Sequence, residues 1–213
     1  MHCSPLSPAN RLSAWAVFAV LAAGWLCTSA AQAASPLRGP PHHRTTVPAS
    51  APPCVHLSAR LPHMGRALCD AAELVATEGR SSQGRTLYAR DVVAPQARLR
   101  VLVVGAMHGD ELSSASLALH WIQRATETPS NAHWRFIPAL NPDGLMARPA
   151  KRVNANGVDL NRNFPTPNWR RDAKIYWEER TRKDPRRWPG PKPLSEPESQ
   201  YLYDEMERFQ PDL

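Results

Sequence analysis

Residues 99–111 read LRVLVVGAMHGDE, an apolar run rich in β-branched residues that ends in a polar cluster. The run from Leu99 to Ala106 predicts a central strand that is covered on both faces. The sheets of α/β proteins place their functional sites where such strands end, and His108 and Glu111 stand there with Gly109 between them for a tight turn. An imidazole and a carboxylate so close together can grip one Zn²⁺, although the same H-x-x-E spacing occurs by chance on helices that face solvent.

The segments around this strand alternate between helix and strand patterns. Residues 67–75 have apolar residues at helical spacing, and a polar turn from Glu78 to Arg85 follows them. Thr86–Val93 and Trp134–Leu140 are strand candidates, and an Asn-Pro-Asp-Gly turn stops the second of them. Between these candidates, apolar residues recur at helical spacing from Leu112 to Ile122. This order predicts an α/β fold with a mixed, mostly parallel central sheet that is flanked by helices.

The last part of the chain combines a basic, proline-rich stretch with a helix. Residues 165–193 contain three tryptophans and an excess of Lys and Arg, which favours a long surface loop whose tryptophans pack on the domain over an anion- or glycan-binding loop. Ser195-Glu196-Pro197-Glu198 has the S-x-x-E form of a capping box. Leu202, Met206 and Phe209 continue at helical spacing, so a final helix is expected there.

The N-terminal residues have the order of a secretory signal peptide. Arg11 precedes an apolar run, and small residues follow it up to Ala31-Gln32-Ala33. We therefore expect a signal peptide at 1–33, a Pro-rich linker at 34–53 and a secreted or periplasmic domain from residue 54 onward. The apolar run is shorter than the ~20 residues that span a bilayer, which disfavours an uncleaved membrane anchor and predicts no stable membrane span after cleavage.

Export affects how the cysteines and the charge are interpreted. Cleavage after Ala33 leaves Cys54 and Cys69, and an even pair in an exported protein suggests a disulfide, with two buried free thiols as the alternative. The formal net charge of the whole chain is +7. Because nucleic acid is a poor partner outside the cytoplasm, an acidic substrate such as a cell-wall peptide, or an anionic polymer, fits this charge better.

Residues 154–164 form the densest polar stretch, NANGVDLNRNF. So many polar side chains are costly to bury unless they bond something. Arg162 offers a planar fork that suits a carboxylate, and Asn161 adds an amide donor beside it. Chemistry alone leaves two interpretations equally open, a ligand-binding loop and a hydrogen-bonded structural loop.

Together with these residues, the order of four further motifs resembles the zinc carboxypeptidase family (metallocarboxypeptidase A-like), and within it the bacterial murein peptide amidases. HGDE is followed by NPDG, by Arg152-x-Asn154-x-x-GVDLNRNF and by GPxPLSEPE, while Ser81-Ser82-Gln83-Gly84-Arg85 resembles the S-x-x-G-R turn that opens this domain. The resemblance runs from about Gly79 to Glu198. It implies a zinc carboxypeptidase catalytic domain, in part, over residues 54–213.

The resemblance also assigns roles to the candidate residues. It implies that His108 and Glu111 are two of three ligands of a Zn²⁺ that activates water as a Lewis acid. Arg152 is expected to polarise the scissile carbonyl, with Arg148 as a second candidate. Asn161 and Arg162 are expected to bind the terminal carboxylate of a peptide substrate. Asp143 and Asp159 are expected to hold turns or to support the site through hydrogen bonds.

Two functional residues of the family lie beyond the Ser-Glu-Pro-Glu helix, a third histidine ligand and a glutamate base. Neither is found before Leu213, and His120 and His133 do not have the ligand's sequence context. We therefore expect a fold that is incomplete at its C-terminus and, for these residues alone, no appreciable peptidase activity. The functions considered are a periplasmic zinc carboxypeptidase that trims cell-wall (murein) peptides, a module that binds peptide C-termini without cleavage, and, less favoured, a zinc amidohydrolase for acylated amino acids.

Overall fold

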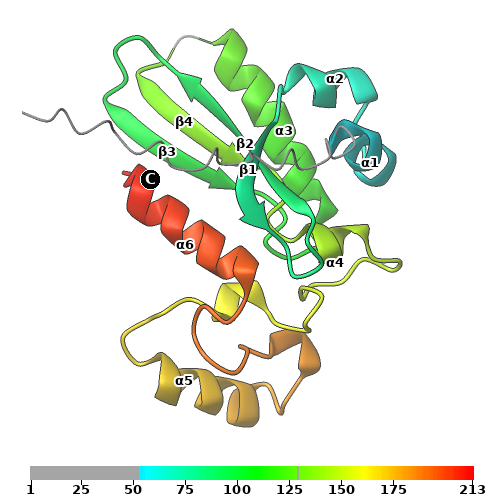
Figure 1. Ribbon diagram of the computed structural model, residues 1–213, viewed down its shortest axis with the longest axis vertical. Helices are drawn as coiled ribbons and strands as arrows, with labels where there is room; N and C mark the ends of the chain where they lie inside the picture. The colour runs from blue at the N-terminus through cyan, green and yellow to red at the C-terminus, as the bar shows by residue number, and fades with distance from the viewer. Residues whose placement is uncertain (1–52, 129) are drawn as a thin grey trace, which may run out of the picture. The chain divides into compact units, whose positions relative to one another are not determined.

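The computed structural model describes residues 53–128 and 130–213 (Figure 1). The expected signal peptide at 1–33, and the expected linker at 34–53 apart from Pro53, lie outside the described residues. Within the described ranges, no helix is both long and apolar enough to cross a membrane. The described residues all belong to one compact unit.

A four-stranded mixed sheet forms the centre of this unit, in the order β1-β2-β4-β3. Its strands are β1 (Val75–Arg80), β2 (Thr86–Val93), β3 (Leu99–Val104) and β4 (Ala132–Ile137). The predicted α/β fold with a mixed sheet and flanking helices is confirmed. Only β3 and β4 pair in parallel, while β1–β2 and β2–β4 are antiparallel, so parallel pairs are not the majority among the described strands.

Strand β3 lies at the edge of the described sheet, where we expected a central strand. Its two faces are partly covered, because Val103 packs against one hydrophobic cluster while Leu102 and Val104 pack against the other, but none of its residues is fully buried. On the side away from β4, β3 bonds to the backbone of Asp212 and Leu213; the Leu102 N–H donates to the Leu213 carbonyl at 2.9 Å. The apolar run therefore indicates that side chains pack on both faces of the strand. An edge strand can have this property as well as a central strand.

The two faces are covered by different helices (Figure 1). Helix α3 (Leu112–Glu127) buries Ala115, Leu119 and Ile122 against one face, as its spacing predicted. Helices α1 (Pro53–Arg60) and α2 (Arg66–Ala71) join the same cluster. Helix α6 (Pro197–Phe209) covers the other face, where Leu202 packs with residues of β2 and β4.

Two predicted helices differ from those in the structure. Helix α2 stops at Ala71, because Glu73 takes a positive φ of 46°, and Val75 instead opens β1 with 62% of its surface exposed. In α6, Leu202 and Phe209 are buried, but Glu205 lies between them on the buried face while Met206 is 43% exposed. Glu205 lies there because it forms ion pairs with Arg135 of β4 and Arg208.

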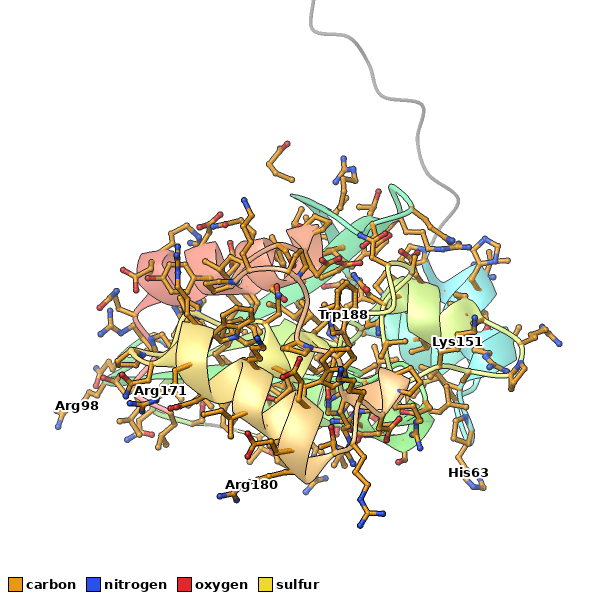
Figure 2. All side chains as sticks on the ribbon, turned by 90° about the horizontal axis from the view of Figure 1, so that it is seen from below. His63, Arg98, Lys151, Arg171, Arg180 and Trp188 are labelled. Atoms are coloured by element: carbon orange, nitrogen blue, oxygen red, sulfur yellow. A yellow bond between two sulfur atoms is a disulfide. The ribbon has the colours of Figure 1, made fainter. Side chains whose placement is uncertain are left out.

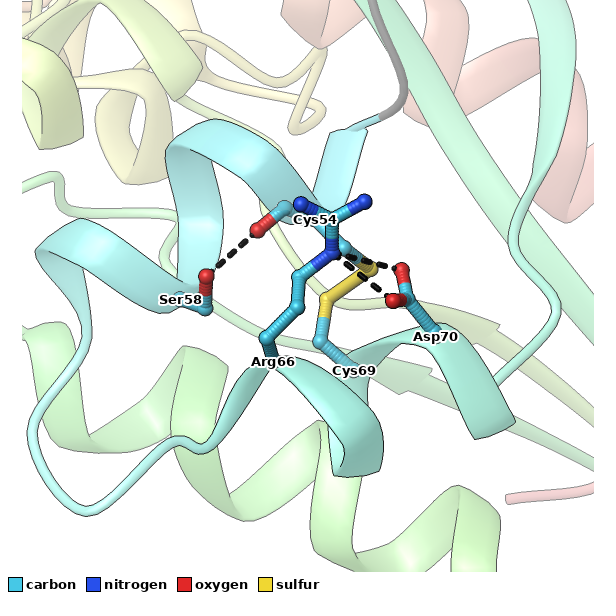
Figure 3. The surroundings of a disulfide bond; sticks show 5 residues. All are labelled: Cys54, Ser58, Arg66, Cys69 and Asp70. Carbon is cyan, nitrogen blue, oxygen red and sulfur yellow. Dashed lines mark hydrogen bonds and ion pairs between the residues drawn. A yellow bond between two sulfur atoms is a disulfide. The ribbon is translucent and has the colours of Figure 1, made fainter.

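A disulfide joins α1 to α2 (Figure 3). It links Cys54 with Cys69, the pair named from the sequence, and their Cα atoms lie 5.5 Å apart. Both cysteines are buried in the cluster beneath α3. Arg66 and Asp70 form an ion pair on the exposed side of α2. The bond therefore fixes the N-terminal helices against the core that supports α3.

Residues 165–193 are more regular than the expected surface loop. They form α5 (Trp169–Ile175), η2 (Tyr176–Arg180) and η3 (Pro185–Arg187), beyond the N-terminal end of α6 in Figure 1. Two tryptophans of this segment donate hydrogen bonds from their indole N–H groups to backbone carbonyls. Trp169 Nε1 donates to the Arg162 carbonyl at 2.6 Å, and Trp177 Nε1 donates to the Asp184 carbonyl at 3.0 Å. The bond of Trp169 joins the segment to the rest of the domain, as the packing interpretation expected, whereas the bond of Trp177 lies within the segment.

Candidate active site

His108 and Glu111 lie in the loop between β3 and α3, as the sequence predicted. His108 is buried and Glu111 is exposed, and His108 Nδ1 lies 2.9 Å from Glu111 Oε1. The expected tight turn is present, because the Glu111 N–H donates to the His108 carbonyl at 3.1 Å, and Gly109 serves a second purpose as well. A Cβ on it would lie 2.2 Å from the backbone carbon of Gly144 and 2.3 Å from the nitrogen of Leu145. Only a glycine lets these two backbones approach so closely, which locks the His108 loop onto the Asn141–Gly144 segment.

That segment forms a short helix, α4 (Pro142–Met146), capped by Asn141. Asn141 Oδ1 accepts from the Gly144 N–H at 2.9 Å, and its Nδ2 donates to the Arg152 carbonyl at 3.1 Å. The buried Asp143 carboxylate accepts from Ser81 Oγ and the Gln83 N–H and forms an ion pair with Arg85. Asp143 thus anchors the turn that contains the S-x-x-G-R residues.

Asp159 connects the residues of the site. It is fully buried, and its Oδ1 lies 3.1 Å from His108 Nε2 and accepts from the Asn161 N–H at 3.2 Å. Its Oδ2 accepts two hydrogen bonds from the Arg152 guanidinium, at 3.1 and 3.0 Å. Burial raises the pKa of Asp159, but the hydrogen bond from His108 and the charge of Arg152 outweigh it and hold the pKa below its usual range. Asp159 is therefore an anion that orients both neighbours.

Arg152 is the arginine that reaches the site. It is buried, and its Nη1 lies 3.8 Å from Glu111 Oε1. Arg148, the second candidate, is exposed and makes no hydrogen bond to His108 or Glu111 in the described part of the chain. The structure thus brings His108, Glu111 and Arg152 together.

Asn161 and Arg162 lie in the 3₁₀ turn η1 (Leu160–Arg162), whose first residues Asp159 caps. Asn161 is exposed and Arg162 is half-buried, so both keep side-chain donors available. They line a pocket of about 290 Å³ together with aromatic residues of 164–176. The Arg162 guanidinium lies 5.0 Å from the centre of the Tyr176 ring, a geometry that favours a cation over the ring face.

Other polar residues of 154–163 have the structural role that was the alternative interpretation. Asn154 is buried, and its Oδ1 accepts from the N–H groups of Asn156 and Val158. Asn163 Nδ2 donates to the carbonyls of Pro189 and Lys192. The structural interpretation therefore holds for the buried residues, which fix the backbone of the loop, and the ligand-binding interpretation stays a prediction for the exposed ones.

The sequence analysis missed one buried cluster, made of Ser82, Asn154, Glu196 and Glu198. Asn154 Nδ2 donates to Glu196 Oε2 at 2.7 Å and to Glu198 Oε2 at 3.1 Å, while Glu198 Oε1 accepts from the Ser82 N–H at 2.8 Å. Burial raises the pKa of Glu198 above its usual range, although these bonds oppose the shift. The expected capping box is wrong, because Ser195 Oγ donates to Glu196 and leaves α6 without a side-chain cap. The sequence did contain a signal for this cluster, because its four polar residues belong to three of the motifs that carry the family resemblance.

The donor set of the site fits zinc. Imidazole nitrogen and carboxylate oxygen are ordinary zinc ligands. When His108 Nε2–H donates to the Asp159 anion, His108 Nδ1 keeps a lone pair directed at Glu111 Oε1, and two acceptors 2.9 Å apart need a proton or a metal cation between them. Across residues 53–128 and 130–213, no group of three or more His, Cys, Asp or Glu could hold a metal ion. His133, on β4, instead contacts Asp91 at 2.9 Å.

The sequence of the chain is similar to that of known proteins. The chain matches the zinc carboxypeptidase family model over residues 63–213. It is 39% identical over 142 residues to murein peptide amidase A of Escherichia coli K12, covering 62% of this chain and 56% of that protein. It is 32% identical over 138 residues to the human carboxypeptidase N catalytic chain, covering 53% of this chain and 29% of that one.

The fold is also found among solved structures. The structure of bovine thrombin-activatable fibrinolysis inhibitor, in complex with tick carboxypeptidase inhibitor, aligns with a TM-score of 0.54 at 20% identity, over 67% of this chain and 52% of that one. The present chain thus spans about half the length of the first relatives that it matches. The family model covers most of the chain and includes every residue of the site, and the chain belongs to the zinc carboxypeptidase family.

Proposed function

We propose that this protein is a zinc-dependent metallocarboxypeptidase that hydrolyses a C-terminal peptide or amide bond of cell-wall murein peptides. The observation that carries the proposal is the buried Asp159, which joins the candidate ligand His108 to the candidate catalytic residue Arg152. A buried carboxylate that holds a ligand histidine by its second nitrogen is a recurrent support of catalytic zinc. His108 and Glu111 would hold the ion.

Each remaining residue has a distinct part in this mechanism. Asn161 and Arg162 would bind the terminal carboxylate of the substrate, since their donors face a pocket and a planar guanidinium suits a carboxylate. Arg152 would hold the oxygen of the scissile carbonyl as negative charge develops on it. Its fixed pairing with Asp159 means that it needs no reorganisation to do so. When bound, Zn²⁺ would supply a Lewis acid that polarises the carbonyl and activates water.

The proposed substrate class rests on two supports. A relative at 39% identity is a murein peptide amidase, and the net charge of +7 suits an acidic peptide stem. The proposed location, secreted or periplasmic, follows from the signal-peptide order at residues 1–33 and gives access to the cell wall. Nucleic acid is not a proposed partner.

A second candidate function is binding of peptide C-termini without cleavage. The observation that favours it is that, among the described residues, His108 and Glu111 are joined by no third group that could complete a metal site. A metal held by two protein donors binds less firmly, and cleavage needs a base as well as a metal.

One set of measurements tests both candidates. Zinc affinity would be measured by competition with a chelating dye, and release of the C-terminal residue from a murein tripeptide would be followed by chromatography. Zinc-dependent release that Arg152→Ala abolishes supports the peptidase. Tight binding of the tripeptide without release supports the binding module. A tripeptide that binds wild type and Arg162→Ala equally well would contradict both.

A further inference from the structure

Helix α1 precedes the residues that the family model matches, which begin at residue 63, yet it contacts the segment that supports the candidate site. Arg60, the last residue of α1, is half-buried. Its Nε donates to the Leu145 carbonyl and its Nη2 donates to the Ala147 carbonyl, both at 2.7 Å. One planar guanidinium thus fastens α1 to the C-terminal end of α4.

Arg60 supplies donors that the end of α4 would otherwise lack, because the last carbonyls of a helix have no partner within the helix. The Gly144 carbonyl accepts from the Lys151 N–H at 2.9 Å, whereas the Leu145 and Ala147 carbonyls accept from Arg60. Hydrogen bonds from a charged donor are stronger than those between neutral groups. Removal of the guanidinium should therefore loosen the end of α4 as well as detach α1.

The end of α4 contacts both loops of the candidate site. On one side, a Cβ on Gly109 would lie 2.3 Å from the Leu145 nitrogen. On the other side, Ala147 begins the segment that leads to Arg152, and the Arg152 carbonyl accepts from the Gly109 N–H at 3.3 Å. The end of α4 thus fixes the backbone of the candidate ligand loop and that of the candidate catalytic arginine relative to each other.

The disulfide to α2 holds α1 at its opposite end, since Cys54 lies in the first turn of α1 and Arg60 in the last (Figure 3). A bond at the first turn of a short helix limits how far its last turn can move. Figure 2 shows His63, which follows α1, on the same side of the domain as Lys151 of the Arg152 loop. This placement agrees with the two bonds that Arg60 donates to the start of that loop.

We infer that Arg60 is a positioning residue for the candidate site, and that the disulfide keeps it in place. It acts through the backbone of α4, on which the His108 loop and Arg152 rest, and would contact neither the metal nor the peptide. This inference rests on the proposed function. It adds a dependence of the site on a helix that lies outside the residues matched by the family model.

The test uses the full-length protein and does not depend on peptide cleavage. In the metal-free protein, Arg60→Ala should speed amide hydrogen exchange at Gly109 and Lys151 by about 10-fold, because both N–H groups bond within the region that Arg60 holds. Zinc affinity, measured by competition with a chelating dye, should fall by about threefold to 10-fold, because Arg60 is further from the metal than a group bonded to a ligand. Arg60→Lys should restore part of both properties, since an ammonium can donate to one of the two carbonyls.

Two control variants separate positioning from a general loss of stability. Arg66→Ala removes the same charge from α2, where Arg66 forms an ion pair with Asp70 on the exposed side. Glu205→Gln weakens the attachment of α6 on the other face of the sheet (Figure 1). Both variants should leave amide exchange at Gly109 and zinc affinity at the wild-type level.

A double-mutant cycle tests the part assigned to the disulfide. Cys54→Ala/Cys69→Ala should lower zinc affinity in the same direction as Arg60→Ala but by a smaller factor. Combined with Arg60→Ala it should add little, because the disulfide acts through Arg60. Additive effects on zinc affinity would overturn this part of the inference.

The remaining outcomes distinguish the inference from the proposed function. Wild-type exchange and wild-type zinc affinity in Arg60→Ala would overturn the positioning role. An equal loss of affinity in Glu205→Gln would also overturn it, because general stability would then explain the effect. A wild-type protein that binds no zinc, with faster exchange at Gly109 in Arg60→Ala, would contradict the proposed function and leave the positioning of the two loops by Arg60 standing.

Discussion

At the scale of single residues, the polar side chains of 152–163 divide by burial into two kinds. Asp159 and Asn154 are buried and hydrogen-bonded to neighbouring residues, whereas Asn161 is exposed and its side-chain amide has no hydrogen-bond partner among the described residues. The sequence predicted that these residues matter, but it left their roles open, because the same amide group can serve either purpose. Only the packing of residues 189–198 around the loop decides which side chains are enclosed.

Asp159→Asn should lower the affinity for zinc by roughly 10-fold to 100-fold, the effect usual for such supporting carboxylates. An amide cannot hold His108 Nε2 and Arg152 as the buried anion does. Competition with a chelating dye measures the change. Asp204→Asn, on the exposed side of α6, is the control. Unchanged affinity in Asp159→Asn would contradict its role at His108.

Asn154→Ala should destabilise the protein by about 2–4 kcal/mol, because it strips donors from two buried carboxylates and an acceptor from two N–H groups. Asn161→Ala should change the free energy of unfolding by less than about 0.5 kcal/mol and should weaken binding of the peptide carboxylate. Urea unfolding and peptide titration of both variants measure this contrast. If both substitutions destabilised the protein equally, the distinction between a buried structural Asn154 and an exposed, ligand-binding Asn161 would be contradicted.

At the scale of elements, three of the four described strands were predicted, but only β2 has the predicted bounds, and β1 lies where a helix end and a polar turn were expected. Thr86–Val93 is a strand with the predicted bounds, and α3 buries the predicted residues. The position of β3 in the sheet was not predictable. Apolar residues indicate that the faces of a strand are covered, but they do not indicate which strands lie beside it. The buried Glu198 was missed for a related reason. The Ser-Glu-Pro-Glu pattern is local, whereas the partners of Glu198, Ser82 and Asn154, lie far away in the sequence.

Helix α6 is held to β4 by an ion pair that should make stability depend on pH. Burial raises the pKa of Glu205, but the hydrogen bond from Arg208 and the charge of Arg135 outweigh it, so the pKa is lowered. A lowered pKa means that this stabilisation is fully present above the ordinary glutamate range and is lost as the pH falls through the folded-state pKa. Glu205→Gln should therefore cost about 1–3 kcal/mol at pH 7.

Urea unfolding of wild type and Glu205→Gln at a series of pH values measures this dependence. The difference in unfolding free energy should narrow as the pH falls below the usual range of a glutamate. Glu207→Gln, an exposed neighbour on the same helix, should show no such trend. A difference that stays constant down to pH 3 would mean that the charge of Glu205 is not what holds α6.

At the scale of the whole described unit, the N-terminal helices are held by a covalent bond as well as by packing. The Cys54–Cys69 disulfide closes a loop with a sequence separation of 15 residues, which in the chain-entropy model stabilises by about 3 kcal/mol. Reduction should therefore lower the midpoint of urea unfolding. The double variant Cys54→Ala/Cys69→Ala should unfold at a lower midpoint that reductant no longer changes. A wild-type midpoint that is insensitive to reductant would contradict this prediction.

The contact of Gly109 with Gly144 and Leu145 bears on how the metal would be acquired. The Gly109 N–H donates to the Arg152 carbonyl at 3.3 Å, and the Lys151 N–H donates to the Gly144 carbonyl at 2.9 Å, so the backbone that carries His108 is fastened before any ion arrives. Most of the conformational entropy of this loop is then lost during folding rather than on binding. Zinc should meet preorganised ligands, and amide hydrogen exchange at Gly109 and Glu111 should be slow and nearly the same with and without the metal.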